Sequence, residues 1–237
     1  MPELAPPENG PPGMGSTLSE RLARVRAEVA NAASEAGRDP AGITTIVVTK
    51  FHPAELVREL AGLGVADVGE NRQQDAGPKA AALTDLALTW HFIGQLQSNK
   101  VRAVLEYATV IHSIDRGSLV SAIEATHLPV DVFIQLNLTD DPGRGGVAPP
   151  ELTPLAERVL AAQNIRLRGV MAVAPLGDDP RAAFERVRAA SDRLRLLAPD
   201  ADSLSMGMSG DFREAILEGA THLRIGTAIT GNRPGGG

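Results

Sequence analysis

The sequence predicts an α/β protein built as a single (β/α)8 barrel, or TIM barrel, with one extra helix on its N-terminal side. Short apolar runs alternate regularly with amphipathic stretches between residues 17 and 231, which is the pattern of parallel strands joined by helices. The runs number eight, and none leads into the glycine fingerprint of a dinucleotide-binding fold. This favours a closed barrel over the alternative, an open doubly wound sheet. A chain of 237 residues can form one such domain around one core.

A helix opens the predicted domain. Thr17 and Glu20 have the spacing of a capping box at its start, and Gly37 follows as a stop signal. The eight predicted strands are residues 44–50, 66–70, 90–94, 109–114, 130–138, 167–173, 202–208 and 221–227. The clearest helix between strands covers residues 179–197, where Pro180 occupies the first turn and apolar residues recur at helical spacing.

Composition separates two tails from the domain and excludes several classes of function. Residues 1–16 and 232–237 are so rich in proline and glycine that we expect disordered tails there. The net charge is −6 and no basic run is present, so we expect no binding to nucleic acid. The lack of cysteine excludes disulfides, thiolate metal sites and thiol nucleophiles. No apolar stretch approaches the roughly 20 residues that cross a bilayer, and no signal-peptide pattern begins the chain, so we expect a cytoplasmic protein without membrane contact.

Two turns made of small residues indicate a phosphate site. In barrels of this kind the chemistry lies where strands end, and phosphate groups lodge at the loops after strands seven and eight. Ser209 follows the seventh predicted strand, and Gly226 and Thr227 end the eighth. Their hydroxyl and backbone N–H groups could together hold one phosphate. The alternative for each turn is structural: Ser209 would cap a helix that starts near Asp211, and Gly226 would only turn the chain.

Two cationic side chains accompany these turns. Lys50 ends the first predicted strand, and there its amine could form a Schiff base with a carbonyl compound; the alternative is a lysine that only reaches solvent. A phosphate site with such a lysine suggests either a sugar-phosphate aldolase or a protein that binds pyridoxal 5′-phosphate. Arg224 lies two residues before Gly226, so we expect both to face the barrel interior. Arg224 would donate to a ring nitrogen of a bound cofactor or, alternatively, pair with an inward carboxylate such as Glu70.

Polar residues after the second and third predicted strands complete the candidates. Asn71 follows Glu70 at the end of the second strand, where the alternative role is to cap the next helix. His91 lies in the third strand, where a hydrogen-bonded core histidine is the ordinary interpretation. The remaining histidines are scattered without the spacing of metal ligands: His52, His112, His127 and His222.

These motifs together resemble the YggS/PROSC family of pyridoxal phosphate homeostasis proteins. In chain order they read VVTKFHP, GENRQQ, WHFIGQLQSNK, IHSIDR, IQLNL, GVMAV, LSMGMSGDF and RIGTAITG. The resemblance covers residues from about Thr17 to Gly231, and only the tails fall outside it. HFIGQLQSNK, LSMGMS and RIGTAI are its most specific parts.

The resemblance implies a fold-type III barrel, similar to the N-terminal domain of alanine racemase, that holds pyridoxal 5′-phosphate (PLP) as a Schiff base on Lys50. It implies that Arg224 meets the pyridine nitrogen and that Asn71 lies near the ring. It also implies three groups around the phosphate, from Ser209, Gly226 and Thr227. The residues after Lys50 and Asn71 depart from the family pattern at Phe51, His52 and Arg72, and Gln95 replaces a common proline.

The resemblance also bears on activity. An arginine at the ring nitrogen opposes protonation there and weakens the ring as an electron sink. Racemases of similar barrel type add a second, β-rich domain with a tyrosine base, whereas the only tyrosine here is Tyr107, far from the expected site. We therefore expect a carrier or buffer of PLP that supplies PLP-dependent apoenzymes, with a low-activity racemase as the alternative. We also expect a monomer, because the second domain that would form a dimer is missing.

Overall fold

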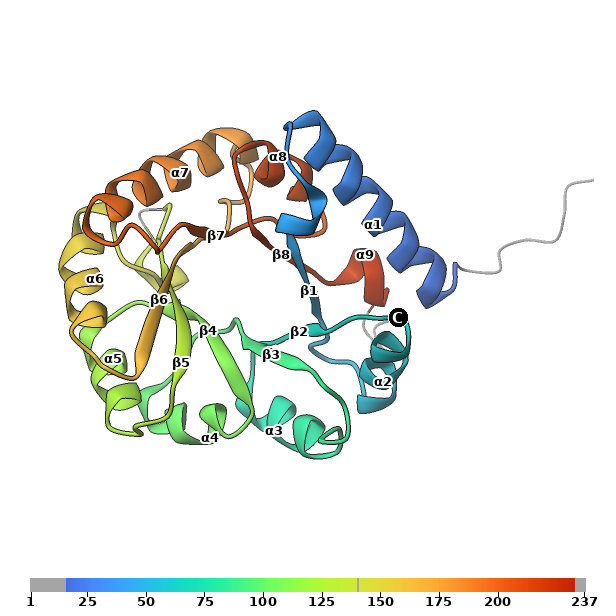
Figure 1. The fold of residues 1–237 in the computed structure, drawn as a ribbon, viewed down its shortest axis with the longest axis horizontal. Coiled ribbons are helices and arrows are strands. Elements are labelled where there is room, and N and C mark those ends of the chain that lie inside the picture. Colours follow the sequence, from blue (N-terminus) through green and yellow to red (C-terminus); the bar gives the residue numbers. More distant parts are fainter. Residues whose placement is uncertain (1–15, 140, 233–237) are drawn as a thin grey trace, which may run out of the picture.

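The protein forms a closed barrel of eight parallel strands, as the sequence predicts. The computed structural model describes residues 16–139 and 141–232, so the predicted tails at 1–16 and 232–237 lie outside the described residues except for residues 16 and 232. Each strand pairs with its neighbours in chain order, and the last strand pairs with the first to close the ring. Figure 1 shows this ring of strands face-on, with the helices outside it.

The eight strands overlap the predicted runs, but six of them end two or three residues before the predicted end. They are β1 Thr44–Val48, β2 Asp67–Glu70, β3 Thr89–Phe92, β4 Ala108–Ile114, β5 Val130–Gln135, β6 Ile165–Met171, β7 Ser203–Ser205 and β8 His222–Ile225. The first strand ends two residues earlier than predicted. The His52 N–H donates to the Thr49 carbonyl at 3.1 Å, and Phe51 takes a left-handed conformation with φ of 69°, so the chain turns before Lys50 can extend the strand.

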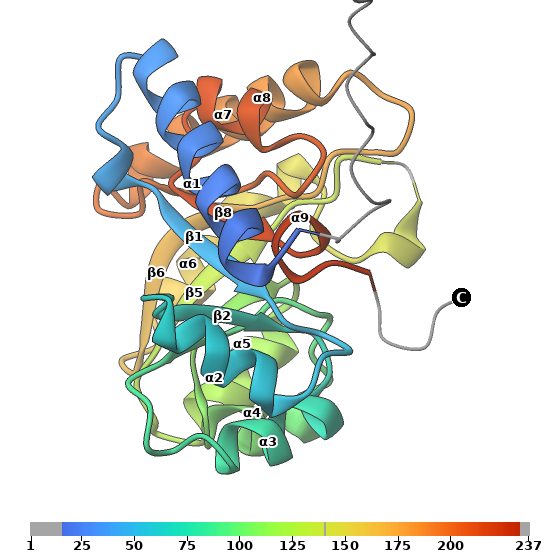
Figure 2. The ribbon, with the colours of Figure 1, turned by 90° about the vertical axis from the view of Figure 1, so that its right-hand side faces the viewer.

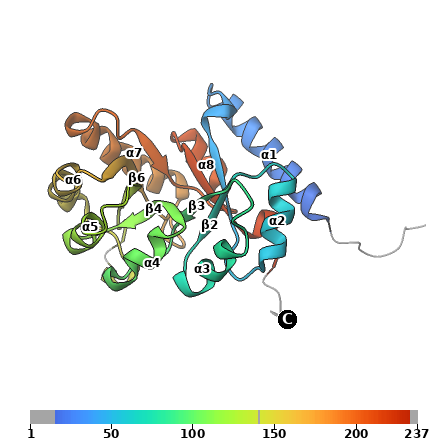
Figure 3. The same cartoon turned by 60° about the horizontal axis from the view of Figure 1, so that its bottom comes forward.

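Nine helices and four short 3-10 turns accompany the strands over the described residues. The helices are α1 Leu18–Glu35, α2 Ala54–Gly62, α3 Gln73–Ala81, α4 Val101–Leu105, α5 Gly117–Glu124, α6 Leu152–Leu160, α7 Pro180–Leu197, α8 Phe212–Leu217 and α9 Thr227–Thr230. The 3-10 turns are η1 Pro40–Gly42, η2 Ser98–Lys100, η3 Pro142–Arg144 and η4 Pro149–Glu151. The tilted view in Figure 3 shows helices α3 to α7 ranged outside the strands.

The extra N-terminal helix begins and ends at the signals that the sequence predicts. The Thr17 hydroxyl accepts from the Glu20 N–H at 3.2 Å, and the Glu20 carboxylate accepts from the Thr17 N–H at 2.8 Å, which is the predicted capping box. Gly37 follows the helix with φ of 65°. Figures 1 and 2 show α1 lying across the outside of the barrel, where it packs on α8 and α9. The helix therefore covers the strand-seven and strand-eight side of the barrel.

Buried apolar side chains of the described residues form two cores. The larger core fills the space between the strands and the surrounding helices, and a smaller cluster of Val110, Phe133 and Met171 lies on β4, β5 and β6. Phe133 also contacts His222 of β8 with ring centroids 5.1 Å apart. Because β5 and β8 are not neighbours in the ring, this contact places Phe133 inside the barrel. Among the described residues, no helix is long and apolar enough to span a membrane.

Candidate functional site

The two turns predicted to bind phosphate lie in contact. The Ser209 hydroxyl accepts a hydrogen bond from the Ala228 N–H, in the first turn of α9, at 3.3 Å. The helix that follows Ser209, α8, has Asp211 at its N-cap position and no side-chain capping hydrogen bond, and the Asp211 carboxylate accepts from the Met208 N–H at 2.6 Å. The alternative that Ser209 caps this helix is therefore wrong. Gly226 precedes α9, and Thr227 begins it with an exposed side chain.

Arg224 lies inside the barrel, with only 4% of its surface exposed. Its guanidinium donates to the Ser205 hydroxyl at 2.7 Å and to the Ala172 carbonyl at 2.8 Å. Burial lowers the pKa of Arg224 to about 10, and the charge of Asp211 opposes that change. The guanidinium is therefore protonated at neutral pH and has fixed partners.

The predicted alternative partner of Arg224, Glu70, lies elsewhere. Glu70 is fully buried, and its carboxylate accepts from the Thr49 hydroxyl at 2.7 Å and forms an ion pair with Lys79. The Lys79 amine also donates to the Thr49 carbonyl at 3.0 Å. Side chains alternate along a strand, and Asp67 in β2 faces the interior, so Glu70 three residues later faces the helices. The prediction that Glu70 points inward was wrong.

Lys50 lies at the rim of the barrel. It follows the end of β1, its side chain is exposed, and its ammonium lies 5.9 Å from the centroid of the Phe51 ring. The guanidinium of Arg72, from the loop after β2, lies 5.9 Å from the same ring. Within the part of the chain that the structure describes, no hydrogen bond or ion pair joins Lys50 to Arg224 or Ser209. The structure brings Ser209 to α9 but leaves the lysine amine separate.

Asn71 offers an unused hydrogen-bond acceptor. Its side-chain oxygen is buried and has no hydrogen-bond partner in the described residues. The alternative role as a helix cap is wrong, because α3 has Arg72 at its N-cap position and no side chain caps it. A buried acceptor without a partner is costly unless a ligand or water supplies a donor. Asn71 therefore has a group available for a bound molecule.

The position of Asn71 depends on Gly94. A Cβ atom at residue 94 would lie 2.2 Å from the Asn71 carbonyl oxygen, which is closer than real contacts allow. We expect Gly94→Ala to lower the free energy of unfolding by about 1–3 kcal/mol, because the loop after β2 must move. Urea unfolding measures this. Gly117→Ala is the control, since a Cβ there meets nothing within 4 Å, and its effect should stay within about 0.5 kcal/mol. Equal effects of the two substitutions would contradict the close approach.

Three histidines meet inside the barrel, and sequence reasoning did not group them. His91 of β3 and His112 of β4 have ring nitrogens 2.9 Å apart, and His222 of β8 has its ring centroid 6.4 Å from that of His112. Each occupies an inward position of its strand, which is the only sequence signal that could have grouped them. Burial, together with neighbouring positive groups, holds the pKa of His112 well below its usual value and lowers that of His222 to about 4. No group of metal ligands occurs among the described residues.

These low values predict acid-sensitive stability. An unfolded histidine has a pKa near 6.5, whereas burial lowers the pKa of the folded His222 to about 4. Between these two values the unfolded protein takes up a proton that the folded protein does not bind. The contribution of His222 to the free energy of unfolding is therefore fully present above pH 6.5 and is lost as the pH falls from 6.5 to 4. We expect His222→Phe to reduce the loss between pH 7.5 and pH 5 by about 1–2 kcal/mol in urea unfolding. His127→Asn, at an exposed position with φ of 58°, is the control and should leave the loss unchanged. The same loss in wild type and His222→Phe would contradict a neutral buried imidazole.

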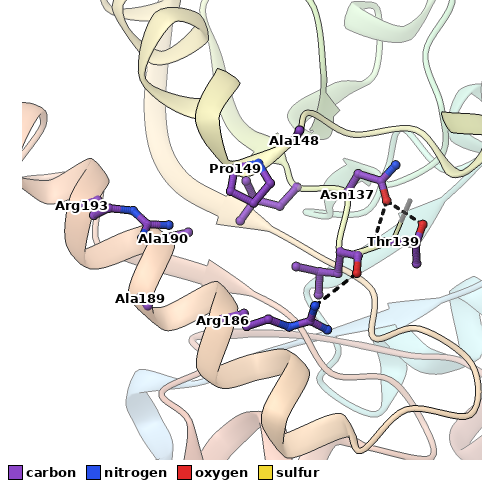
Figure 4. A pocket seen from close by; sticks show the side chains of 10 residues that line it. Asn137, Thr139, Ala148, Pro149, Arg186, Ala189, Ala190 and Arg193 are labelled. Carbon is purple, nitrogen blue, oxygen red and sulfur yellow. Dashed lines mark hydrogen bonds between the residues drawn. The ribbon is translucent and has the colours of Figure 1, made fainter. Parts of the chain in front are cut away.

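A cavity on the outer wall of the barrel is separate from this site. It measures about 440 Å³ and lies between α7 and the chain that follows β5. Figure 4 shows Arg186, Ala189 and Arg193 projecting from α7 on one side, with Asn137 and Thr139 on the other. None of the six predicted site residues lines this cavity.

Comparison with known proteins gives one consistent family. Residues 21–234 match the family model described as "Alanine racemase, N-terminal domain". A pyridoxal phosphate homeostasis protein of Pseudomonas aeruginosa is 44% identical over 92% of this chain and 96% of its own length. The Escherichia coli protein of the same name is 38% identical over 91% of this chain and 97% of its own length.

Solved structures agree. PipY of Synechococcus elongatus, solved with PLP bound, superposes with a TM-score of 0.80 at 35% identity, covering 90% of this chain and 99% of PipY. Alanine racemase of Corynebacterium glutamicum superposes with a TM-score of 0.65 at 18% identity, covering 91% of this chain and 62% of the racemase, which shows a shared fold. The chain thus belongs to the family of pyridoxal phosphate homeostasis proteins, and it matches the model of the alanine racemase N-terminal domain.

Proposed function

We propose that the protein binds PLP and buffers its supply to other enzymes, without efficient catalysis of its own. The observation that carries this proposal is the contact of Ser209 with the first turn of α9, at the end of the strand that holds the buried Arg224. The relation to PipY, which was solved with PLP bound, and to proteins named for pyridoxal phosphate homeostasis supports the same ligand.

The chemistry of the residues fits a phosphorylated pyridine. The Ser209 and Thr227 hydroxyls and the backbone around Gly226 supply the small, close-fitting donors that phosphate needs. The buried Asn71 oxygen lacks a donor, which a ligand hydroxyl could supply. The protonated guanidinium of Arg224 supplies a donor for the ring nitrogen. We therefore assign the two hydroxyls and the backbone at Gly226 to the phosphate. We assign Asn71 to the ring substituents and Arg224 to the ring nitrogen.

One lysine is assigned to the aldehyde. PLP carries an aldehyde that condenses reversibly with a primary amine. The chain contains three lysines, Lys50, Lys79 and Lys100. The Lys79 amine is buried and already bonded to Glu70 and Thr49. Lys100 ends the turn η2, eight residues beyond β3, whereas Lys50 lies two residues beyond β1, which is paired with the strand of Arg224. We therefore assign the covalent link to Lys50.

Two features support a carrier over a catalyst. Arg224 keeps a fixed positive charge where the ring nitrogen would otherwise gain a proton, which disfavours carbanion formation at the substrate. Tyr107 cannot act as a base at the barrel mouth. Its ring packs edge-on against Trp90 with centroids 6.0 Å apart, and burial raises the pKa of its hydroxyl far above the usual value.

The racemase alternative rests on the fold shared with alanine racemase of Corynebacterium glutamicum. The two proposals are separated by incubating the PLP-loaded protein with alanine or serine in deuterium oxide. We expect no exchange at Cα at rates typical of enzymes, about 1 per second or faster. Exchange at such rates would replace the carrier proposal with the racemase.

The proposed recipients are PLP-dependent apoenzymes, served by a monomeric carrier. Light scattering should give a mass near the 24.8 kDa of one chain. Loaded protein mixed with a PLP-dependent apoenzyme should restore its activity faster than an equal amount of protein treated with borohydride. Equal rates from loaded and reduced protein would contradict transfer of the cofactor.

A further inference from the structure

A continuous chain of hydrogen bonds crosses the interior of the barrel. It joins Arg224 to Ser205 at 2.7 Å, Ser205 to His112 at 2.8 Å, His112 to His91 at 2.9 Å, and His91 to Asp67 at 3.0 Å. These five residues, from β8, β7, β4, β3 and β2, are called the interior chain below. Barrel interiors of this class are ordinarily packed with branched apolar side chains, so a polar chain across one requires an explanation.

The direction of every hydrogen bond in the interior chain follows from its two ends. The guanidinium of Arg224 can only donate, so the Ser205 oxygen accepts from it. Ser205 is fully buried, and among the described residues the acceptor that its own hydroxyl proton meets is the His112 Nδ1 atom. His112 must then carry its proton on Nε2 and donate to Nδ1 of His91.

The hydrogen bonds at the Asp67 end of the interior chain have a fixed direction as well. His91 accepts at Nδ1, so its proton lies on Nε2, where it donates to the Asp67 carboxylate. A carboxylate only accepts, which agrees with this direction. All five groups are satisfied with both imidazoles neutral and both in the Nε2–H form. The opposite direction would leave the buried Ser205 hydroxyl proton without an acceptor, at a cost of about 1–3 kcal/mol.

The interior chain is held rigidly and runs from one end of the barrel to the other. The His112 ring stacks on Phe133 with centroids 4.5 Å apart and planes 15° apart, which fixes the ring plane. Asp67 is the first residue of β2, and 29% of its side chain is exposed. Arg224 bonds at its other side to the carbonyl of Ala172, just after β6 ends. The interior chain therefore connects the Arg224 guanidinium to the Asp67 carboxylate at the opposite, N-terminal end of the strands.

We propose that Ser205 and His112 are positioning residues for Arg224, and that the bonds onward to His91 and Asp67 hold the His112 tautomer that this task needs. This inference rests on the proposed function only where it assigns Arg224 to the cofactor ring. The positioning itself is a property of the protein without cofactor. An aromatic ring could pack in the place of His112, but it could not accept the Ser205 proton.

The surroundings of His112 favour this neutral form. A second proton would turn Nδ1 into a donor and remove the acceptor of Ser205. Burial is the main cause that keeps the pKa of His112 low, and the positive or protonatable groups of His91, Arg224 and His222, which face it, add to this effect. The Asp67 carboxylate lies one residue further away, beyond His91, and Arg168 and Asp211 face the neighbouring His222 and Arg224.

The tautomers can be measured without cofactor. Nitrogen-15 NMR of the imidazole rings at pH 7 should show His91 and His112 both neutral and both protonated on Nε2. The Arg224 guanidinium N–H signals should exchange slowly with water in wild type and in His222→Phe. His222 packs inside the barrel but is not part of the interior chain. They should exchange at least about tenfold faster in His112→Phe and in Ser205→Ala. A protonated Nδ1 on His112, or equal exchange in all four proteins, would overturn the proposal.

Binding then tests the link to the cofactor. PLP titration should give at least about tenfold weaker affinity and a shifted visible absorbance maximum for His112→Phe and Ser205→Ala. Ser205→Thr, which keeps the hydroxyl, should restore both, and His222→Phe should match wild type. Unchanged affinity and spectrum in Ser205→Ala would overturn the positioning role while leaving the proposed function intact. Failure of wild type to bind PLP would overturn the proposed function, and the NMR exchange rates would still decide the positioning of Arg224.

Discussion

Lys50→Ala is expected to abolish covalent attachment of PLP while leaving the barrel folded. The Lys50 side chain is exposed, and its ammonium lies 5.9 Å from the centroid of the Phe51 ring, so its removal takes almost nothing from the core. We expect the visible absorbance band of the loaded protein to disappear. The free energy of unfolding should change by less than about 0.5 kcal/mol. Absorbance spectra of protein incubated with PLP, together with urea unfolding, measure both effects.

Lys100→Ala is the matched control, because Lys100 is also exposed and lies in a turn that follows a strand. It should keep the absorbance band and the stability of wild type. Lys79→Ala is unsuitable as a control, because it would leave the buried carboxylate of Glu70 without its charged partner. A Lys50→Ala protein that retains the band, or that does not fold, would contradict the assignment of this lysine.

Arg224→Ala is expected to weaken PLP binding by about a hundredfold and to change the absorbance maximum. Hydrogen bonds to charged groups contribute about 1.5–3 kcal/mol each, and about 1.4 kcal/mol corresponds to a tenfold change in affinity. The substitution removes the charged donor proposed for the ring nitrogen and also frees its two partners, the Ser205 hydroxyl and the Ala172 carbonyl. Titration with PLP, followed by absorbance, measures the affinity and the spectrum together.

A conservative variant separates charge from geometry. Arg224→Lys keeps the positive charge but cannot donate to Ser205 and Ala172 from two nitrogens at once, so we expect an affinity between those of wild type and alanine. Arg186→Ala, in the outer cavity of Figure 4, is the control and should leave the affinity unchanged. An Arg224→Ala protein with wild-type spectrum and affinity would show that the guanidinium does not meet the ring.

The fold could be predicted from the sequence because each element carries a local signal. Eight apolar runs with helical stretches between them indicate the barrel, and Thr17 with Glu20 marks the start of the first helix. Strand ends were less predictable. The first strand stops at Val48 because Phe51 adopts a left-handed conformation. Phenylalanine rarely adopts this conformation, and no pattern in the sequence predicts it here.

The site was predictable where it depends on strand order and not where it depends on register. Ser209 and the turn at Gly226 follow adjacent strands, so their meeting follows from the topology. The contact of His91 with His112 needs the pairing of β3 with β4, in which His91 lies opposite Val110 and both histidines face inward. The inward assignment of Glu70 failed for the same reason, because the sequence does not show which face of a short strand points into the barrel.

The covalent attachment of PLP to Lys50 is the central claim, and reductive trapping tests it most directly. Wild-type protein is incubated with PLP, reduced with borohydride, digested and mapped by mass spectrometry, which reads out the three lysines of the chain separately. We predict the added mass of the reduced cofactor on the peptide that contains Lys50, with none on the peptides of Lys79 and Lys100. Modification of either other lysine in preference to Lys50, or a protein that carries no cofactor mass after reduction, would contradict the account.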